Sequence, residues 1–203
     1  MPQAPARNPA VFLNVPFDAR YRPLFISLLA GLTALSCDPH CVLEVPSGPR
    51  NRLDRIYSLI ASCGASIHDL SRVTLSGPLR VPRFNMPFEL GLAYAIAQGQ
   101  PHDLFVFEEQ SHRLQASLSD FNGYDPHIHD GTQVGVLRCV LDCFGTTTQA
   151  PPSPKLKSLT RKLSQVVLRL QHDQGAHDPF HPHVFRQSVK AAVELAKAAD
   201  LIQ

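Results

Sequence analysis

The sequence has no run of apolar residues long enough to cross a membrane as a helix, which takes roughly 20 residues. The first residues, MPQAPARNPA, include no hydrophobic region of the kind a signal peptide has, so we expect no signal peptide. Charge of neither sign dominates, because 19 basic and 17 acidic residues give a net charge of +2 and no run is strongly basic. These absences argue against a membrane protein and against direct binding to nucleic acid, and they predict a cytoplasmic protein.

Cysteine is scarce and its number is odd. The five thiols, Cys37, Cys41, Cys63, Cys139 and Cys143, are typical of buried free cysteines rather than of a disulfide framework. The CDPHC segment could contribute metal ligands, but no second ligand pair stands at the spacing of a closed zinc site. We therefore expect neither a metal nor another cofactor.

Short apolar runs alternate with helical patterns along a chain of 203 residues that is 44% hydrophobic. This length and composition suit one α/β domain with a core. The predicted strands and helices are, in chain order, strand Ala10–Val15, helix Leu24–Leu35, strand His40–Val45, helix Arg50–Cys63, strand Ala65–Leu70, a loop and helix within Pro82–Gly99, strand Asp103–Phe107 and helix Val134–Phe144. The alternation predicts a flavodoxin-like, doubly wound sheet of four to five mainly parallel strands.

The second half of the chain is more polar. Residues 108–132 are turn-rich and predict a loop, and Gln149–Pro154 (QAPPSP) predicts an extended linker. Two amphipathic helices follow, over Leu156–Leu170 and Phe185–Ala196. We therefore predict an α/β domain at 1–148 and a C-terminal helical extension at 149–203. The extension would pack on the domain or on a second subunit, and we expect a homo-oligomer.

The stretch PRFNMPFELGLAYAIAQG, residues 82–99, predicts a loop that leads directly into a helix. Asn85 suits the N-cap and Pro87 suits the first turn. The apolar residues that we expect to face inward recur at helical spacing: Phe88, Leu92 and Ala95. Glu89 then falls in the first turn, where the helix dipole favours an ionised carboxylate. It could also do no more than complement that dipole.

Polar residues follow the predicted strands in three clusters: Asn14 with Asp18, Asp69 with Ser71, and Asn85 with Glu89. In doubly wound sheets, ligands bind beyond the carboxyl ends of the strands, at the point where the strand order reverses. We therefore expect the three clusters to share one binding site. Asp125, His127 and His129 could line the same opening or be ordinary surface groups.

Three segments together, FLNVPF, a third strand that ends in an aspartate, and FELGLAYA, resemble the nucleoside 2-deoxyribosyltransferase-like superfamily. The resemblance covers roughly Val11 to Phe107. That superfamily includes N-glycosidases that act on nucleoside monophosphates, and TIR-type NAD-cleaving domains are similar in layout. The chain departs from typical transferases because PRFNMPF replaces their Asp-Ser-Gly approach to the catalytic glutamate.

The resemblance implies a role for each matching residue. Glu89 matches the catalytic glutamate and Asp69 the acid that ends the third strand. Asn14, Phe17 and Asp18 match the loop that holds the sugar or base. We also predict as substrate-binding residues Pro16, Ser71, Asn85, Met86 and Asp125, which belong to or neighbour the polar segments described above. The implied activity is cleavage of the N-glycosidic bond of a nucleotide, nucleoside or NAD, by hydrolysis or by transfer. A domain of this type with appended helices also resembles bacterial anti-phage defence effectors. The alternatives are a nucleotide-sensing module without turnover and an interaction scaffold.

Overall fold

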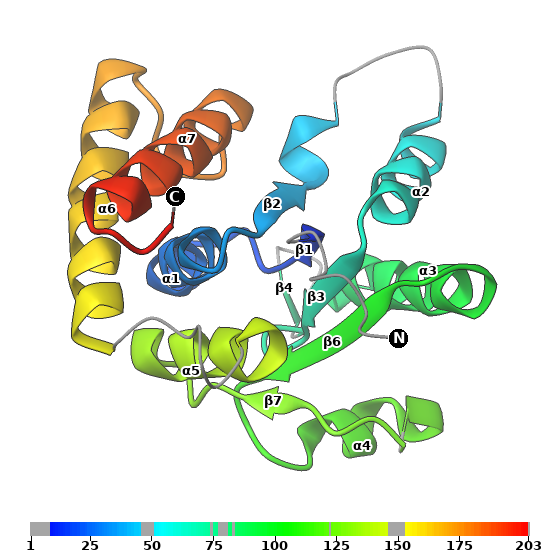
Figure 1. Ribbon diagram of the computed structural model, residues 1–203. Helices are drawn as coiled ribbons and strands as arrows, with labels where there is room; N and C mark the ends of the chain where they lie inside the picture. Colours follow the sequence, from blue (N-terminus) through cyan, green and yellow to red (C-terminus); the bar gives the residue numbers. More distant parts are fainter. Residues whose placement is uncertain are drawn as a thin grey trace.

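Five parallel strands form one sheet through the middle of the molecule (Figure 1). The computed structural model describes residues 9–45, 51–73, 75–76, 81–82, 84–121, 123–145 and 153–202. The strands are β1 (Ala10–Asn14), β2 (Asp38–Cys41), β3 (Ala65–Asp69), β6 (Asp103–Glu108) and β7 (His127–Ile128). Their order is β2-β1-β3-β6-β7, so the chain winds outward in both directions from β1. This confirms the predicted doubly wound sheet and puts its switch point between β1 and β3.

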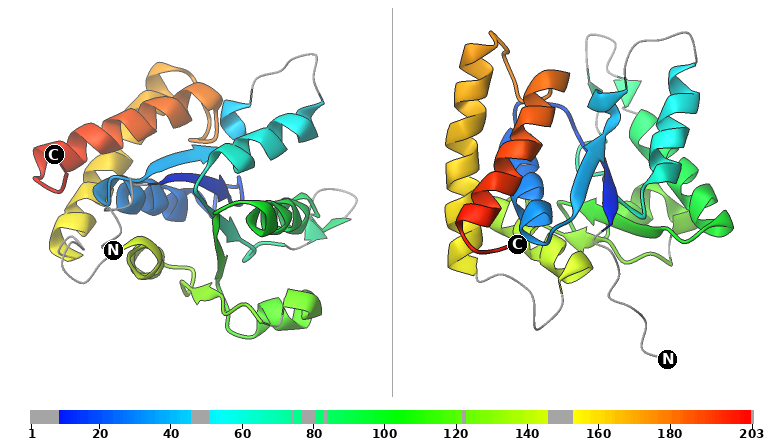
Figure 2. Two further views of the ribbon diagram at one scale, coloured as in Figure 1. Left: turned by 45° about the vertical axis from the view of Figure 1, so that its right-hand side comes forward. Right: turned by 45° about the horizontal axis from the view of Figure 1, so that its top comes forward.

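Helices cover both faces of the sheet (Figure 2). On one face lie α2 (Arg52–Ser62) and α3 (Asn85–Gly99), and on the other α1 (Arg22–Ala34) and α5 (Gln133–Phe144). Outside α1 lie α6 (Ser153–Asp173) and α7 (Pro182–Ala198). The short elements are the strand pair β4 (Leu75–Ser76) and β5 (Val81–Pro82), helix α4 (Arg113–Ser117), and the 3-10 turns η1 (Val42–Glu44) and η2 (Ser119–Phe121). Within the described ranges, no helix is long and apolar enough to span a membrane.

Helix α1 is the centre of the larger core. Every residue from Leu24 to Ala34 is buried, because the sheet, α5, α6 and α7 surround the helix. At Gly31 a Cβ atom would stand 3.1 Å from the Val140 side chain, so the glycine permits the close approach of α5.

The C-terminal helices belong to this same core. Phe185 of α7 is fully buried against Phe25 of α1, with their ring centroids 5.9 Å apart, and Phe180 packs on Phe25 at 5.2 Å. We expected these helices to pack either on their own domain or on a second subunit, and in the structure they pack on their own domain. Their apolar faces are covered within the chain, and the homo-oligomer stays a prediction. Most of the predicted linker, residues 149–152, lies outside the described residues.

The second strand differs from its prediction. It occupies Asp38–Cys41 instead of His40–Val45, and the chain then turns into η1. The cause is Glu44, whose carboxylate accepts hydrogen bonds from the Cys41 backbone N–H at 3.1 Å and from His40 Nδ1 at 2.9 Å. The Glu44 side chain thus closes a turn at the segment VLEV, where the mostly apolar sequence predicts that the strand continues.

Two predictions about α3 were wrong. Asn85 is the first helical residue and caps nothing, since Phe84 precedes it without a capping side chain. The inward face is also a different one, because Phe88 is 52% exposed. The residues that α3 buries are Met86, Glu89, Leu90, Ala93 and Ile96. The helix is apolar on nearly every side, so its hydrophobic spacing did not single out a face.

The segment 108–132, predicted as a loop, contains α4, η2 and the edge strand β7. Strand β7 has only two residues and pairs with Phe107 and Glu108 at the end of β6. His129, which directly follows β7, is completely buried rather than exposed at a rim.

Candidate functional site

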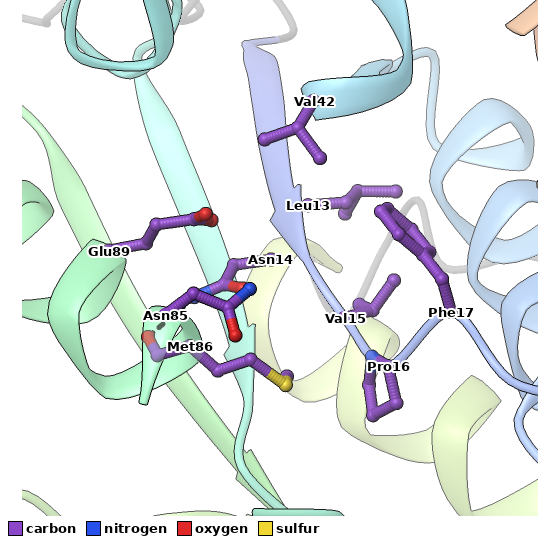
Figure 3. Close-up of a pocket in the computed structure, with 9 residues that line it drawn as sticks. All are labelled: Leu13, Asn14, Val15, Pro16, Phe17, Val42, Asn85, Met86 and Glu89. Carbon is purple, nitrogen blue, oxygen red and sulfur yellow. Dashed lines mark hydrogen bonds between the residues drawn. The ribbon is translucent and has the colours of Figure 1, made fainter. Parts of the chain in front are cut away.

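A pocket of about 290 Å³ opens beside the carboxyl end of β1, at the switch point of the sheet (Figure 3). Its walls come from β1 and the loop after it, from η1 and from the start of α3. The lining residues are Leu13, Asn14, Val15, Pro16, Phe17, Val42, Asn85, Met86 and Glu89. Asn14, Pro16, Phe17, Asn85, Met86 and Glu89 were predicted as site residues, and the structure brings them together.

Glu89 is the acidic side chain of this pocket. It extends from α3 toward the cavity, with Phe17 on the opposite wall (Figure 3). The residue is only 6% exposed, and among the described residues no hydrogen-bond donor reaches its carboxylate. Burying an unpartnered carboxyl group is costly, so its position against a cavity suggests that a ligand supplies the missing partner.

The charge state of Glu89 differs from the prediction. Glu89 is the fifth residue of α3, beyond the first turn, so the helix dipole does not hold it ionised. Burial raises the pKa of Glu89 to about 7, and the positive charge of Arg52 opposes this only in part. Near neutral pH the side chain therefore exists in both forms, and it can lose or take up a proton.

Asn14 joins the end of β1 to the start of α3. Its Nδ2 group donates to the Met86 carbonyl oxygen at 2.8 Å and to His68 Nδ1 at 2.9 Å. These contacts span 72 and 54 residues of sequence. They hold the α3 backbone next to Glu89 against the strand, so the amide organises the pocket.

A buried polar chain continues from Asn14 along β3. His68 Nε2 lies 3.0 Å from Ser66 Oγ, which lies 2.8 Å from His102 Nε2, and His102 Nδ1 lies 3.0 Å from the Cys63 carbonyl oxygen. Burial, with a smaller effect of His102, lowers the pKa of His68 to about 3, so this imidazole is neutral at physiological pH. We did not predict His68 or Ser66 as site residues; the only signal was their position, as polar residues, in a strand predicted to be buried.

Comparisons with protein-family models, curated proteins and solved structures found no match. The functional argument therefore rests on the site itself.

Asp69 does not line this pocket. It neighbours His68 in sequence, and successive strand residues point to opposite faces of a sheet. Asn14 and His68 are register partners and share the α3 face, whereas Asp69 faces α1. There its carboxylate is fully buried and accepts hydrogen bonds from the Tyr21 hydroxyl and the Ser71 backbone N–H.

His129 completes this second polar cluster. Its Nε2 atom is 3.2 Å from Asp69 Oδ2, and its Nδ1 accepts from the Gly131 backbone N–H. Burial lowers the pKa of His129, but the adjacent Asp69 carboxylate outweighs it, so the net direction is upward. Burial, with the charge of Asp69, raises the pKa of Tyr21 well above its ordinary value. The cluster is enclosed, so its residues support the fold rather than contact a ligand.

The other predicted site residues also lie apart from the pocket. Asp18 accepts from the Tyr21 backbone N–H at 3.1 Å and pairs with Arg72 at 2.7 Å, so it holds the start of α1. Ser71 is buried, and its carbonyl accepts from Arg113. Asp125 is exposed in the segment before β7. We expected three polar clusters to meet at one site. Asn14, Asn85 and Glu89 do meet at the pocket, whereas Asp69 and Ser71 do not line it.

No group of three or more His, Cys, Asp or Glu side chains that could hold a metal ion occurs among the residues that the structure describes. All five cysteines are free thiols. Burial raises the pKa of Cys37 and of Cys63 to about 11. These thiols are therefore protonated at neutral pH and are poor nucleophiles.

Proposed function

We propose that this chain cleaves the N-glycosidic bond of a nucleoside, nucleotide or NAD, with the Glu89 carboxylate facing the anomeric carbon. The observation that supports the proposal most directly is the buried, unpartnered Glu89 side chain in a pocket at the switch point of the sheet. The resemblance of FELGLAYA to the glutamate helix of N-glycosidases points to the same residue.

Cleavage of an N-glycosidic bond requires one carboxylate in a poorly solvated site. As the bond between C1′ and the base nitrogen breaks, its electron pair leaves with the base and positive charge develops on the sugar. An ionised Glu89 would stabilise that charge or bond to C1′, and water or another acceptor would then take the sugar. A carboxylate surrounded by apolar side chains is more effective than one in water, because the local dielectric is low.

The choice of leaving group follows from which acids line the pocket. Among the described residues that line the pocket, Glu89 is the one titratable side chain, and Asp69, the expected second acid, is enclosed on the other face of the sheet. A neutral purine or pyrimidine leaves more readily with a proton donor. Nicotinamide leaves from a pyridinium that is already cationic, so it needs no donor. The lining therefore favours NAD or a smaller nicotinamide nucleoside as substrate.

The size of the pocket agrees with part of a dinucleotide. A volume of about 290 Å³ lies just below the range of about 300–1,000 Å³ that is usual for ligand sites. It suits a nucleoside or one half of NAD.

Release of free base is the direct test. The protein would be incubated with NAD, nicotinamide riboside, the common nucleosides and their monophosphates, and the products separated by chromatography. We expect Glu89→Gln to lower the rate by on the order of 10²–10³-fold while ligand binding persists. Glu89→Asp, which withdraws the carboxylate by about one methylene, should cost about 10²-fold.

The matched control is Glu194→Gln, since Glu194 is an exposed glutamate of α7 far from the lining residues in sequence and contacts. It should turn over like the wild type. Near-wild-type turnover by Glu89→Gln would contradict the proposed mechanism. Specific nucleotide binding without base release would favour the sensing module instead, and neither binding nor release would favour the scaffold.

A further inference from the structure

Asn14 can offer only one of its two amide atoms to a ligand. Both hydrogens of Nδ2 are used, one toward the Met86 carbonyl oxygen and one toward His68 Nδ1. The amide oxygen Oδ1 has no donor among the described residues, and it is not enclosed by protein. Since Asn14 lines the pocket, this oxygen is available to accept a hydrogen bond from a bound molecule.

The orientation of this amide is determined chemically. A rotated side chain would place Oδ1 2.8 Å from the Met86 carbonyl oxygen, and two acceptors cannot bond to each other.

The rest of the polar chain can be assigned in agreement with this orientation of Asn14. With Nδ2 of Asn14 as donor, His68 Nδ1 accepts and His68 Nε2–H donates to the Ser66 hydroxyl. Ser66 then donates to His102 Nε2, and His102 Nδ1 donates to the Cys63 carbonyl, which can only accept. Every proton in the chain is placed, with the Asn14 oxygen left over at the pocket.

Asn14 and Glu89 are the two buried polar side chains among the described lining residues, and both are acceptors once Glu89 is ionised. Figure 3 shows that Asn14 and Glu89 reach the same cavity from β1 and from α3. A ligand that satisfies both must bring at least two donors on one small group. Among the parts of a nucleoside, the neighbouring 2′- and 3′-hydroxyls of ribose have this character.

We infer that the pocket selects a ribosyl over a 2′-deoxyribosyl group, through hydrogen bonds from the sugar hydroxyls to the Asn14 amide oxygen and the Glu89 carboxylate. The inference rests on the proposed function and deepens it. Removing the 2′-hydroxyl would leave one buried acceptor unpaired. A site built to bond a hydroxyl group discriminates strongly against an analogue that lacks it.

The test compares matched pairs of ligands by two separate readouts. Binding of adenosine and 2′-deoxyadenosine, and of nicotinamide riboside and its 2′-deoxy analogue, would be measured by ligand-observed NMR at pH 8. Base release would be followed in parallel. We expect each ribosyl compound to bind on the order of 10-fold to 100-fold more tightly than its 2′-deoxy partner. Asn14→Ala should reduce this preference by about tenfold.

Asn51→Ala is the matched control, because Asn51 caps α2 through the Leu53 backbone N–H and does not line the pocket. It should keep the full ribosyl preference. If Asn14→Ala does not fold, the wild-type ratio decides alone.

Each outcome separates the two proposals. Equal or tighter binding of the 2′-deoxy compounds overturns the ribosyl preference even if base is released. Ribosyl-selective binding without base release supports the preference and overturns the proposed cleavage. Binding of L-arginine or agmatine in place of any nucleoside overturns both, since a guanidinium group also brings several donors. Binding of none of these compounds likewise overturns both.

Discussion

Replacing Glu89 with glutamine should make the protein more stable above neutral pH. The wild-type carboxyl group is buried without a partner, and burial raises its pKa from the ordinary 4.5 to about 7. At 1.36 kcal/mol for each pKa unit, the ionised form costs the folded state about 3 kcal/mol relative to the unfolded chain. Glutamine has nearly the same shape and no charge, so it avoids this cost.

The sign of the pH dependence follows from the order of the two pKa values. Below about pH 4.5 the side chain is protonated in both the folded and the unfolded chain. Between about pH 4.5 and 7 only the unfolded chain is ionised, so the folded protein holds an extra proton and its stability falls as pH rises. Above about pH 7 the loss is complete. The stability advantage of Glu89→Gln should therefore grow across this window and then level off.

Urea unfolding followed by circular dichroism at pH 4.5, 5.5, 6.5, 7.5 and 8.5 would measure the effect. In the difference in unfolding free energy between Glu89→Gln and wild type, the contributions of all titrating groups that the two proteins share cancel. We expect this difference to rise by about 3 kcal/mol from the lowest to the highest pH. Glu194→Gln should give a flat difference, since Glu194 is 73% exposed. A flat or falling curve for Glu89→Gln would refute the assignment of an uncompensated buried carboxyl group.

Two further substitutions test the packing around the site. Tyr21→Phe removes the hydroxyl that donates to buried Asp69 and should lower the unfolding free energy by about 1.5–3 kcal/mol. The control Tyr57→Phe, at a side chain that is 48% exposed, should change the unfolding free energy little. Equal effects of the two substitutions would contradict a buried hydrogen bond between Tyr21 and Asp69. Phe185→Ala should cost about 3–5 kcal/mol in the same urea assay, because Phe185 is fully buried against α1. The control Leu168→Ala, on the exposed side of α6, should lower the unfolding free energy by about 0.5 kcal/mol. If Phe185→Ala lowers it equally little, the C-terminal helices fold apart from the domain.

The predicted fold class held where the sequence signal was local. Strands β1 and β6 are nearly continuous apolar runs between turns, as in a sheet buried on both faces. Strand β7 escaped prediction because a two-residue strand has no period to detect. Strand β2 was displaced because one carboxylate, that of Glu44, closes the turn of η1.

The candidate site was only partly predictable, and the reason is geometric. Sequence motifs identified Asn14 and Glu89 but gave no register between β1 and β3, which decides the side of the sheet that each residue faces. Once Asn14 pairs with His68, alternation along the strand sends Asp69 to the other face. The environment of Glu89 likewise depends on the contact between Asn14 and Met86, two residues that are 72 positions apart.

Strand β3 is buried along its whole length, yet Ser66, His68 and Asp69 are polar. A purely apolar strand at this place would tolerate a shift by one residue, since both faces of the sheet meet hydrophobic helices. In β3 the same shift would turn His68 toward Tyr21 and Asp69 toward Phe12, and leave each polar group without its partner. Every group so orphaned costs about 1–3 kcal/mol. The polar residues of β3 therefore specify its register with the neighbouring strands. They raise the free energy of sheets with a shifted register during folding, before any ligand is bound.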